Sequence, residues 1–337
     1  MSQGTVFPNF SGLREDLADV ISIVDNKNTP VTSTARKGAD ITNPGVFSWQ
    51  ASEYNEPSFD GVLTNADVST FDDASSTRAL LSGRAMKFRR AIKTDDFTQI
   101  SDIAGIGKNK AFAHSVSKSL VELKRDIEAA VCSDRNSQEQ ASTNPYRTRG
   151  LGSWISNTAQ SSDLPVPAAF RTPSASINTT ATGSLTETEV QAVLQSMYQV
   201  TGTMSSMMLV CGPELKRAFT GFTRFAGGTV NLAGLSVRTF TQSAESKKIV
   251  ASIDSFHGDF GVLDIVPSLF LAKDQAEASQ LRRGYVLSAD MIELRYGRRP
   301  RFQELEDMGG GKRALVDAIA ALVCMNPKGL AKFAATS

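Results

Sequence analysis

The sequence predicts an α+β protein organised around one long helix. Hydrophobic and polar residues alternate near residues 47–51 and 86–92, which is the period of a β-strand. Residues 109–133 instead repeat their hydrophobic residues every three or four positions, as an amphipathic helix does. From Thr229 onward, short hydrophobic segments separated by turn residues predict a series of strands. With 337 residues, 41% of them hydrophobic, the chain suits about two domains with genuine cores.

Composition argues against several classes of protein. Thirty-six Lys and Arg against 35 Asp and Glu leave a formal charge of +1, so no overall charge attracts the chain to nucleic acid or membrane. The most hydrophobic segment, residues 314–325, is too short to span a bilayer and contains Asp317. Cys132, Cys211 and Cys324 never form a Cys-x-x-Cys pair, which favours buried reduced thiols over zinc or disulfides. The N-terminus does not resemble a signal peptide, so we expect a soluble protein made in the cytosol.

The first 45 residues are expected to form an extended arm that contains one short helix. Hydrophobic residues recur at helical spacing from Leu13 to Val24, Ser11 can cap this helix, and Thr29-Pro30 ends it. Residues 29–44 are rich in Ser, Thr, Gly, Asn and Pro, and are expected to form a loop. A helix this short is marginal in water, so its hydrophobic face must dock on another surface.

Residues 46–100 separate acidic from basic side chains. The acids, with no base among them, are Glu53, Glu56, Asp60, Asp67, Asp72 and Asp73. The bases, with no acid among them, are Arg78, Arg84, Lys87, Arg89, Arg90 and Lys93. Strands near Trp49 and Phe88 are expected to be the two arms of a long hairpin, with residues 55–76 as its polar tip. Ordering a polar loop costs roughly 1 to 2 kcal/mol of backbone entropy per residue, which favours a neighbouring subunit as its partner.

Nucleic acid is the alternative partner for these bases. The adjacent acidic arm carries equal and opposite charge, which would largely cancel the field that a phosphate backbone feels, so a protein partner is favoured. A second basic cluster comprises Arg295, Arg298, Arg299 and Arg301. It is followed closely by Glu304, Glu306 and Asp307, and this compensated pattern again indicates subunit contacts.

The long helix is expected to begin near Asn109, because Gly105 and Gly107 disfavour helix before it, and to end near Ser133. Its hydrophobic face comprises Phe112, Val116, Leu120, Leu123, Ile127 and Ala130 or Val131. Its polar face comprises Lys118, Glu122, Lys124, Arg125 and Glu128. At 1.5 Å per residue such a helix is roughly 36 Å long, which suits a structural beam.

The second half of the chain alternates loops, helices and strands. Residues 136–148 and the proline-containing residues 156–183 are expected to be exposed loops. Helices are expected after Thr186 and over residues 214–222, on either side of a buried strand at 207–211. Further strands are expected at 237–241, 249–253, 261–266, 285–287 and 292–296. Residues 312–324 suit either helix or strand, and we expect a strand.

No residue pattern indicates catalysis, a metal or a cofactor. His114 and His257 have no second ligand at a suitable spacing. Gly105-Ile-Gly-Lys108 and Gly309-Gly-Gly-Lys312 resemble phosphate loops but do not complete that motif, so turns are the better interpretation. Asp259-Phe-Gly261 matches a kinase tripeptide without the other kinase motifs.

Several short motifs follow one another along most of the chain. They are Arg14-Glu-Asp-Leu17, Asp19-Val-Ile21, Thr29-Pro30, Lys37-Gly38, Phe47-Ser-Trp-Gln50, Glu122-Leu-Lys-Arg-Asp-Ile-Glu-Ala-Ala130, Gly150-Leu-Gly-Ser-Trp154, Asp259-Phe-Gly-Val-Leu263, Val266-Pro267 and Leu287-Ser-Ala-Asp-Met291. In this order they resemble the major capsid proteins of tailed bacteriophages with the Hong Kong 97-like fold.

The resemblance implies a division of the chain into named parts. An N-terminal arm covers residues 1–45, and an extended β-hairpin called the E-loop covers residues 46–100. The P-domain, crossed by the long spine helix, takes residues 101–184 and 285–337. Between these two parts, residues 185–284 form an A-domain with a mixed sheet and flanking helices.

The implied function is assembly, not turnover. Copies of the chain form hexamers and pentamers that close into an icosahedral shell around double-stranded DNA. The implied site is the subunit interface, made by the acids and bases of residues 53–93 together with Arg298 and Arg299. No cofactor, metal or catalytic residue is implied. Expected partners are a separate scaffolding protein, a portal, a decoration protein and non-specifically bound packaged DNA, in a virion assembled in the bacterial cytoplasm without a membrane.

Some relatives join their subunits by a Lys-Asn isopeptide bond. The Lys, Asn and assisting acid of that bond have no match in this chain, so a noncovalent shell is expected. The region before the E-loop is short for a large cleavable scaffolding segment, so any scaffold is expected to be a separate protein. Two alternatives remain: an encapsulin-type compartment of the same fold, and a phosphate-binding enzyme that uses Lys108 or Lys312.

Overall fold

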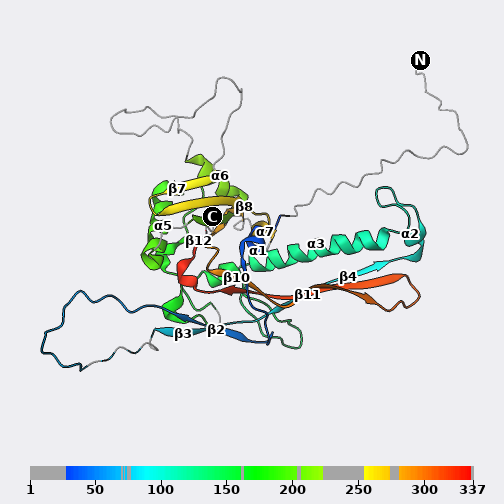
Figure 1. The fold of residues 1–337 in the computed structure, drawn as a ribbon. Helices are drawn as coiled ribbons and strands as arrows, with labels where there is room; N and C mark the ends of the chain where they lie inside the picture. The colour runs from blue at the N-terminus through cyan, green and yellow to red at the C-terminus, as the bar shows by residue number, and fades with distance from the viewer. Residues whose placement is uncertain are drawn as a thin grey trace, which may run out of the picture.

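The computed structural model describes residues 28–69, 71, 73, 77–160, 163–202, 206–222, 254–273 and 281–334. These residues form an elongated molecule (Figure 1). A globular part with a six-stranded sheet lies at one end, and a long helix extends from it beside a four-stranded sheet. A separate two-stranded hairpin points the opposite way. The helix expected from Leu13 to Val24 and the strands expected at 237–241 and 249–253 lie outside the described residues.

The four-stranded sheet supports the long helix. Its strands are, in order, β1 (Arg36–Lys37), β10 (Ile292–Leu305), β11 (Lys312–Cys324) and β4 (Met86–Thr94). Helix α3 (Ala111–Val131) packs along β4 and β11, and it confirms the expected helix to within two residues at each end. Strand β11 matches the strand expected at 312–324. Its residues Ala314, Val316 and Ala318 are buried in the same core as Leu123 and Ile127 of α3.

The six-stranded sheet forms the globular end. Its strands are, in order, β5 (Ile177–Asn178), β12 (Ala331–Ala334), β9 (Arg283–Leu287), β6 (Ser206–Cys211), β8 (Gly261–Pro267) and β7 (Ser255–Gly258). Helices α5 (Glu187–Thr201) and α6 (Pro213–Gly221) pack in its core through Leu194 and Phe219. Thr186 and Glu189 form a reciprocal capping box that starts α5, as the sequence predicts. The expected boundary between the A-domain and the second part of the P-domain, at residues 284 and 285, falls inside β9. Strand β12, from the C-terminal end of the chain, also joins this sheet.

The hairpin differs from its prediction. Strand β2 (Phe47–Ser52) pairs with β3 (Arg78–Gly83), not with the strand around Phe88. That strand is β4, which pairs with β11 instead, so the prediction of its partner is wrong. The physical reason is burial, since Phe88 and Ile92 lie in the core beneath α3, which a two-stranded hairpin cannot supply.

Two segments expected as loops contain buried structure. Residues 156–183 are not an exposed excursion, because Val166, Phe170 and Ser176 are buried. Prolines direct this segment through the 3-10 turns η1 (Ala168–Phe170) and η2 (Ser174–Ser176). Residues 29–44 contain α1 (Pro30–Thr34) and β1. In both cases polar composition concealed a few well-placed hydrophobic anchors.

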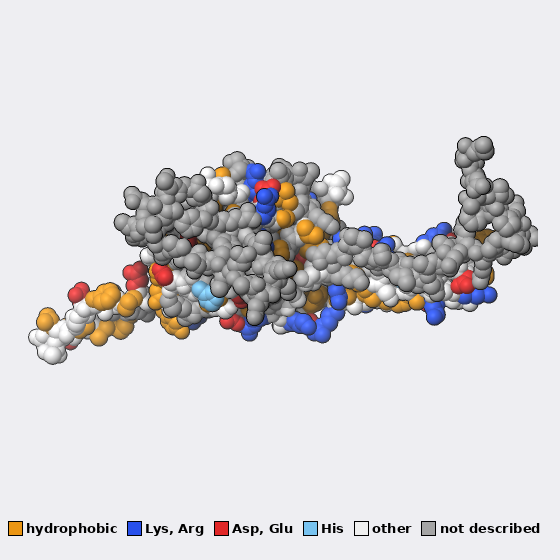
Figure 2. Space-filling model, turned by 90° about the horizontal axis from the view of Figure 1, so that it is seen from above, with side chains coloured by type: hydrophobic (Ala, Val, Ile, Leu, Met, Phe, Trp, Pro, Cys, Tyr) orange, Lys and Arg blue, Asp and Glu red, His pale blue; other side chains and the backbone are white. Residues whose placement is uncertain are grey.

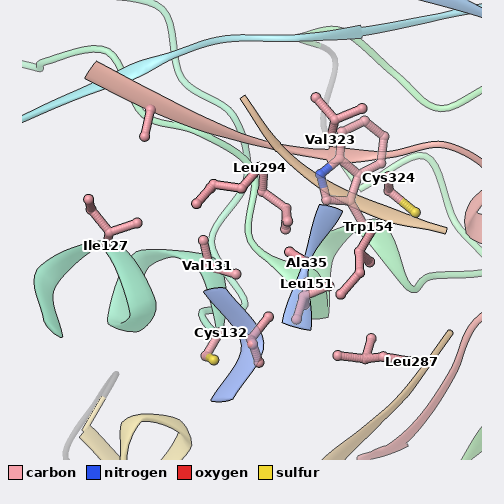
Figure 3. Packing of buried hydrophobic residues seen from close by; sticks show 14 of the residues in the cluster. Ala35, Ile127, Val131, Cys132, Leu151, Trp154, Leu287, Leu294, Val323 and Cys324 are labelled. Carbon is pink, nitrogen blue, oxygen red and sulfur yellow. The ribbon is translucent and has the colours of Figure 1, made fainter. Parts of the chain in front are cut away.

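The main core joins α3 to both sheets. Figure 3 shows Ile127 and Val131 of α3 facing the same interior as Trp154 and Leu294. Trp154 belongs to the buried turn α4 (Leu151–Trp154), and Phe270 of α7 (Phe270–Lys273) packs in the same core. The remaining short helices are α2 (Asp96–Ile100), which is exposed, and η4 (Pro327–Gly329). The three cysteines are buried, as expected, and none of them forms a disulfide within the described chain.

Candidate assembly interface

The loop between β2 and β3 is the most exposed part of the described chain. Residues 53–69, 71 and 73 contain no helix or strand. Six large hydrophobic side chains in this loop are at least 72% exposed: Tyr54, Phe59, Val62, Leu63, Val68 and Phe71. Figure 2 shows the protruding end of the molecule covered by hydrophobic and acidic side chains, with no basic ones among them. A patch of this kind marks an interaction surface.

The sequence interpretation weighed only the acids of this loop. Glu56, Asp60, Asp67 and Asp73 are exposed, whereas Asp72 lies outside the described residues. Glu53 does not point outward, because both of its carboxylate oxygens accept hydrogen bonds from Lys328 Nζ at 3.0 and 2.9 Å. The sequence contains a signal that this interpretation missed. The loop holds six large hydrophobic residues that follow neither a helical nor a strand period, and a loop tip that faces only solvent does not need them.

Arg84 is a structural residue at the root of the hairpin, not an exposed contact. Its side chain is buried, and it donates to both carboxylate oxygens of Asp163 at 3.1 and 2.9 Å and to the carbonyl of Gly45 at 3.1 Å. The hydrogen bond to Asp163 raises the pKa of Arg84, with Glu139 at 3.3 Å adding to the effect. Charge at this position therefore holds the hairpin to the body of the subunit.

Arg90 is also bound within the subunit. It donates to both oxygens of Asp126 on α3 at 2.7 and 2.6 Å, and this hydrogen bonding raises its pKa. Arg78 is exposed on β3. The basic segment of the sequence is thus divided between the hairpin, the hairpin root and β4.

The face of the four-stranded sheet turned away from α3, here called the outer face, collects most of the remaining bases. Residues directly opposite one another on adjacent strands point to the same side, and the register places Arg89, Asp317 and Arg301 in one row. By alternation, seven bases belong to this face: Lys87, Arg89, Lys93, Arg295, Arg298, Arg301 and Arg313. Only two acids, Glu293 and Asp317, accompany them on these three strands.

Asp317 organises the middle of the outer face. Its carboxylate is 1% exposed and accepts hydrogen bonds from Arg298 and Arg301, each at 2.9 Å. Burial raises the pKa of Asp317, but the hydrogen bonds and charges of the two arginines outweigh burial and lower it below 3.8. Arg298 therefore already forms an ion pair inside the subunit, whereas Arg299 is exposed and lies 3.8 Å from Asp40.

The described residues hold no group of three potential metal ligands. Lys312 begins a strand, with Nζ at 6.0 Å from the ring centre of Phe112, so the glycines before it do not lead into a phosphate-binding helix. Asp259-Phe-Gly261 spans the turn from β7 to β8. Among the helices that the structure describes, none has the length and hydrophobicity needed to cross a membrane. The outstanding surfaces are the hydrophobic acidic loop and the basic outer face.

The model of one protein family, the SU10 major capsid protein, matches residues 1–337. The chain belongs to this major capsid protein family. No curated protein matches the chain. The predicted relationship to phage major capsid proteins is therefore confirmed, and this family favours a phage capsid over an encapsulin-type compartment.

Solved structures confirm the predicted fold of this major capsid protein. A structure from Gordonia phage Cozz has a TM-score of 0.59 at 13% identity, covering 96% of this chain and 92% of that one. The capsid of an empty GTA particle gives 0.60 at 9% identity, covering 98% and 96%. The Cyanophage Pam1 capsid gives 0.55 at 11% identity, covering all of both chains. The protein is thus a structural component of a virion capsid that associates with its own copies into a shell.

Proposed function

We propose that this major capsid protein assembles as hexamers and pentamers into an icosahedral shell around double-stranded DNA, through contact of its loop with a neighbouring copy. The proposal is carried by the six hydrophobic side chains of the loop, which are almost fully exposed in the subunit. Fully burying one such side chain stabilises an interface by about 1.5 to 3 kcal/mol. That gain contributes to offsetting the entropy cost of ordering the loop, together with the backbone and polar contacts of an interface, whereas the subunit alone supplies none of them.

The contact is head-to-tail, because the loop and the basic outer face are different surfaces of the same chain. Contacts of this type form rings when the rotation closes. Exposed ion pairs contribute only about 0 to 1 kcal/mol each, so charge selects the partner surface and the hydrophobic side chains supply most of the free energy. We expect a noncovalent shell assembled in the host cytoplasm with a separate scaffolding protein, a portal and a decoration protein.

The test is assembly of the purified chain, followed by sedimentation and electron microscopy with and without a candidate scaffold. A double variant, Phe59→Ser with Leu63→Ser, changes two exposed residues, so the subunit should keep its circular dichroism and melting temperature but lose most closed particles. Asn65→Ser, an exposed polar change in the same loop, is the matched control. Normal shells from the double variant would show that the loop does not carry assembly.

A further inference from the structure

Two buried arginines lie close to one carboxylate where the hairpin leaves the body of the subunit. Arg84 is 5% exposed and Arg149 is 1% exposed. Arg84 donates to both carboxylate oxygens of Asp163 and lies 3.3 Å from Glu139, so it is bound to two acids. Within the described chain Arg149 pairs with no carboxylate, and its Nη2 donates to the carbonyl of Leu164 at 2.8 Å. The acids are therefore divided unequally between the two bases.

The guanidinium of Arg149 has donors left over. Its Nε and Nη1 have no hydrogen-bond partner among the described residues, and both atoms are closed to solvent. The ring of Trp154 covers one face of the group, with Cζ of Arg149 at 4.7 Å from the ring centre. Burial lowers the pKa of Arg149 to about 10, and the charge of Asp163 opposes that effect. A carboxylate that reached these donors would therefore be bound strongly.

Asp163 is the acid whose charge acts on Arg149. Nη2 of Arg149 already lies 3.4 Å from the backbone oxygen of Asp163, so the two residues are neighbours. When the carboxylate of Asp163 turns to Arg149, Arg84 keeps Glu139, whose side chain is 66% exposed. Each arginine then holds one carboxylate. The exchange satisfies donors of Arg149 that are otherwise unpartnered, and it removes one of the two acids that hold Arg84.

The exchange acts on the hairpin because Arg84 also binds the backbone at its root. Nη1 of Arg84 donates to the carbonyl of Gly45 at 3.1 Å, and the N–H of Ala85 donates to the carbonyl of Pro44 at 3.0 Å. Both hydrogen bonds join the chain that enters β2 to the chain that leaves β3. Loss of the bidentate pair with a carboxylate frees the guanidinium to move, so the hold on Gly45 weakens.

We propose that Asp163 is a transferable carboxylate that latches the root of the hairpin. In the closed position, which the structure shows, Asp163 and Glu139 both hold Arg84. In the open position Asp163 pairs with Arg149. Glu139 alone then holds Arg84, and the root loosens without unfolding. The inference goes beyond the proposed function, because it concerns a single subunit and needs no neighbouring copy.

Amide exchange of the unassembled, full-length chain tests the latch, because the sign of the change separates a latch from a fixed anchor. Glu139→Gln removes the acid that Arg84 keeps in the open position. Amides of residues 45–48 and 82–85, at the paired root of the hairpin, should therefore exchange more slowly than in wild type, by on the order of threefold. Arg149→Met removes the base that receives Asp163 and should slow the same amides. A fixed anchor predicts faster exchange in Glu139→Gln, because Arg84 would only lose an ion pair.

Arg171→Met is the matched control. Arg171 lies in the same segment as Asp163, and its Nε donates to the carbonyl of Val166 at 3.0 Å, so this change should leave exchange at the root unaltered. Unchanged or faster exchange in Glu139→Gln would overturn the latch. That variant alters a mostly exposed side chain, so the result does not depend on whether Arg149→Met folds. Equal slowing in Arg171→Met would also overturn the latch, and failure of the chain to form shells would refute the proposed function without touching this test.

Discussion

Replacing Glu128 tests the least expected interaction in the subunit. The helical pattern places Glu128 on the polar side of α3, yet it is fully buried, and its two oxygens accept hydrogen bonds from the backbone N–H groups of Val31 and Thr32, each at 2.8 Å. These are orphan donors in the first turn of α1. A buried donor without a partner costs about 1 to 3 kcal/mol. The N–H of Thr32 is only partly buried, so a water molecule can replace part of the hydrogen bonding that it would lose without Glu128.

We therefore expect Glu128→Ala to lower the free energy of unfolding by about 2 to 4 kcal/mol. Glu128→Gln keeps one acceptor but turns an amide N–H2 group towards a donor, so it should lose about half as much. The assay is urea unfolding of unassembled subunits, followed by the fluorescence of Trp49 and Trp154. Glu122→Ala, on the same helix with Lys118 at 3.9 Å as an exposed ion-pair partner, should change stability by less than about 0.5 kcal/mol.

Limited proteolysis gives a second measure of the same contact. If Glu128 holds α1 against α3, a protease should cleave the Glu128→Ala variant near Ala35, at the end of α1, faster than it cleaves the wild-type chain. The reasoning would be refuted if Glu128→Ala unfolded within about 0.5 kcal/mol of wild type. It would then follow that water satisfies both N–H groups equally well.

Three further predictions concern other parts of the subunit. The lowered pKa of Asp317 means that its carboxylate stabilises the fold above its unfolded pKa of about 4 and loses that contribution as the pH falls through its folded value. Urea midpoints of wild type should thus fall more steeply below about pH 4 than those of Asp317→Asn. Burial raises the pKa of Cys211 to about 12 and raises that of Cys324, so a thiol reagent at about pH 8 should react only after unfolding. Gly311 has a φ of +96°, and an added Cβ would collide with the backbone oxygen of Thr94. Gly311→Ala should therefore destabilise the subunit by more than about 2 kcal/mol in urea unfolding, against about 1 kcal/mol for Gly309→Ala, whose added Cβ meets open space.

Local periodicity predicted the elements that depend on local physics. Helix α3 has an uninterrupted hydrophobic stripe, and α5 carries its own capping box, so both were located closely from sequence. Strand β11 was less certain because its alanines favour helix, but the closely packed surface beneath α3 suits small side chains at Ala314, Ala318 and Ala320. Tertiary packing here outweighs intrinsic propensity.

Interactions between distant segments could not be predicted. Nothing near Glu128 in the sequence indicates that Val31, 97 residues earlier, donates to it. The partner of β4 is set by the core beneath α3, which includes residues more than 200 positions later on β11. Likewise, Arg84 resembled an exposed base until folding placed it against Asp163. Glu128 and Arg84, two charged side chains that the sequence placed at the surface, are therefore structural residues of the folded subunit.

These corrections change what the charge separation of residues 46–100 means. If both segments were arms of one hairpin, as the sequence indicated, their opposite charges would satisfy each other and leave little for a neighbour. The fold instead sends the acidic segment into a protruding loop and the basic strand β4 into the rigid sheet. Arg84 at the hairpin root and Glu53 at the start of the loop are both bound inside the subunit and hold the hairpin in place. One chain thus presents two complementary surfaces that its own geometry keeps apart, which is the condition for a head-to-tail contact repeated from copy to copy.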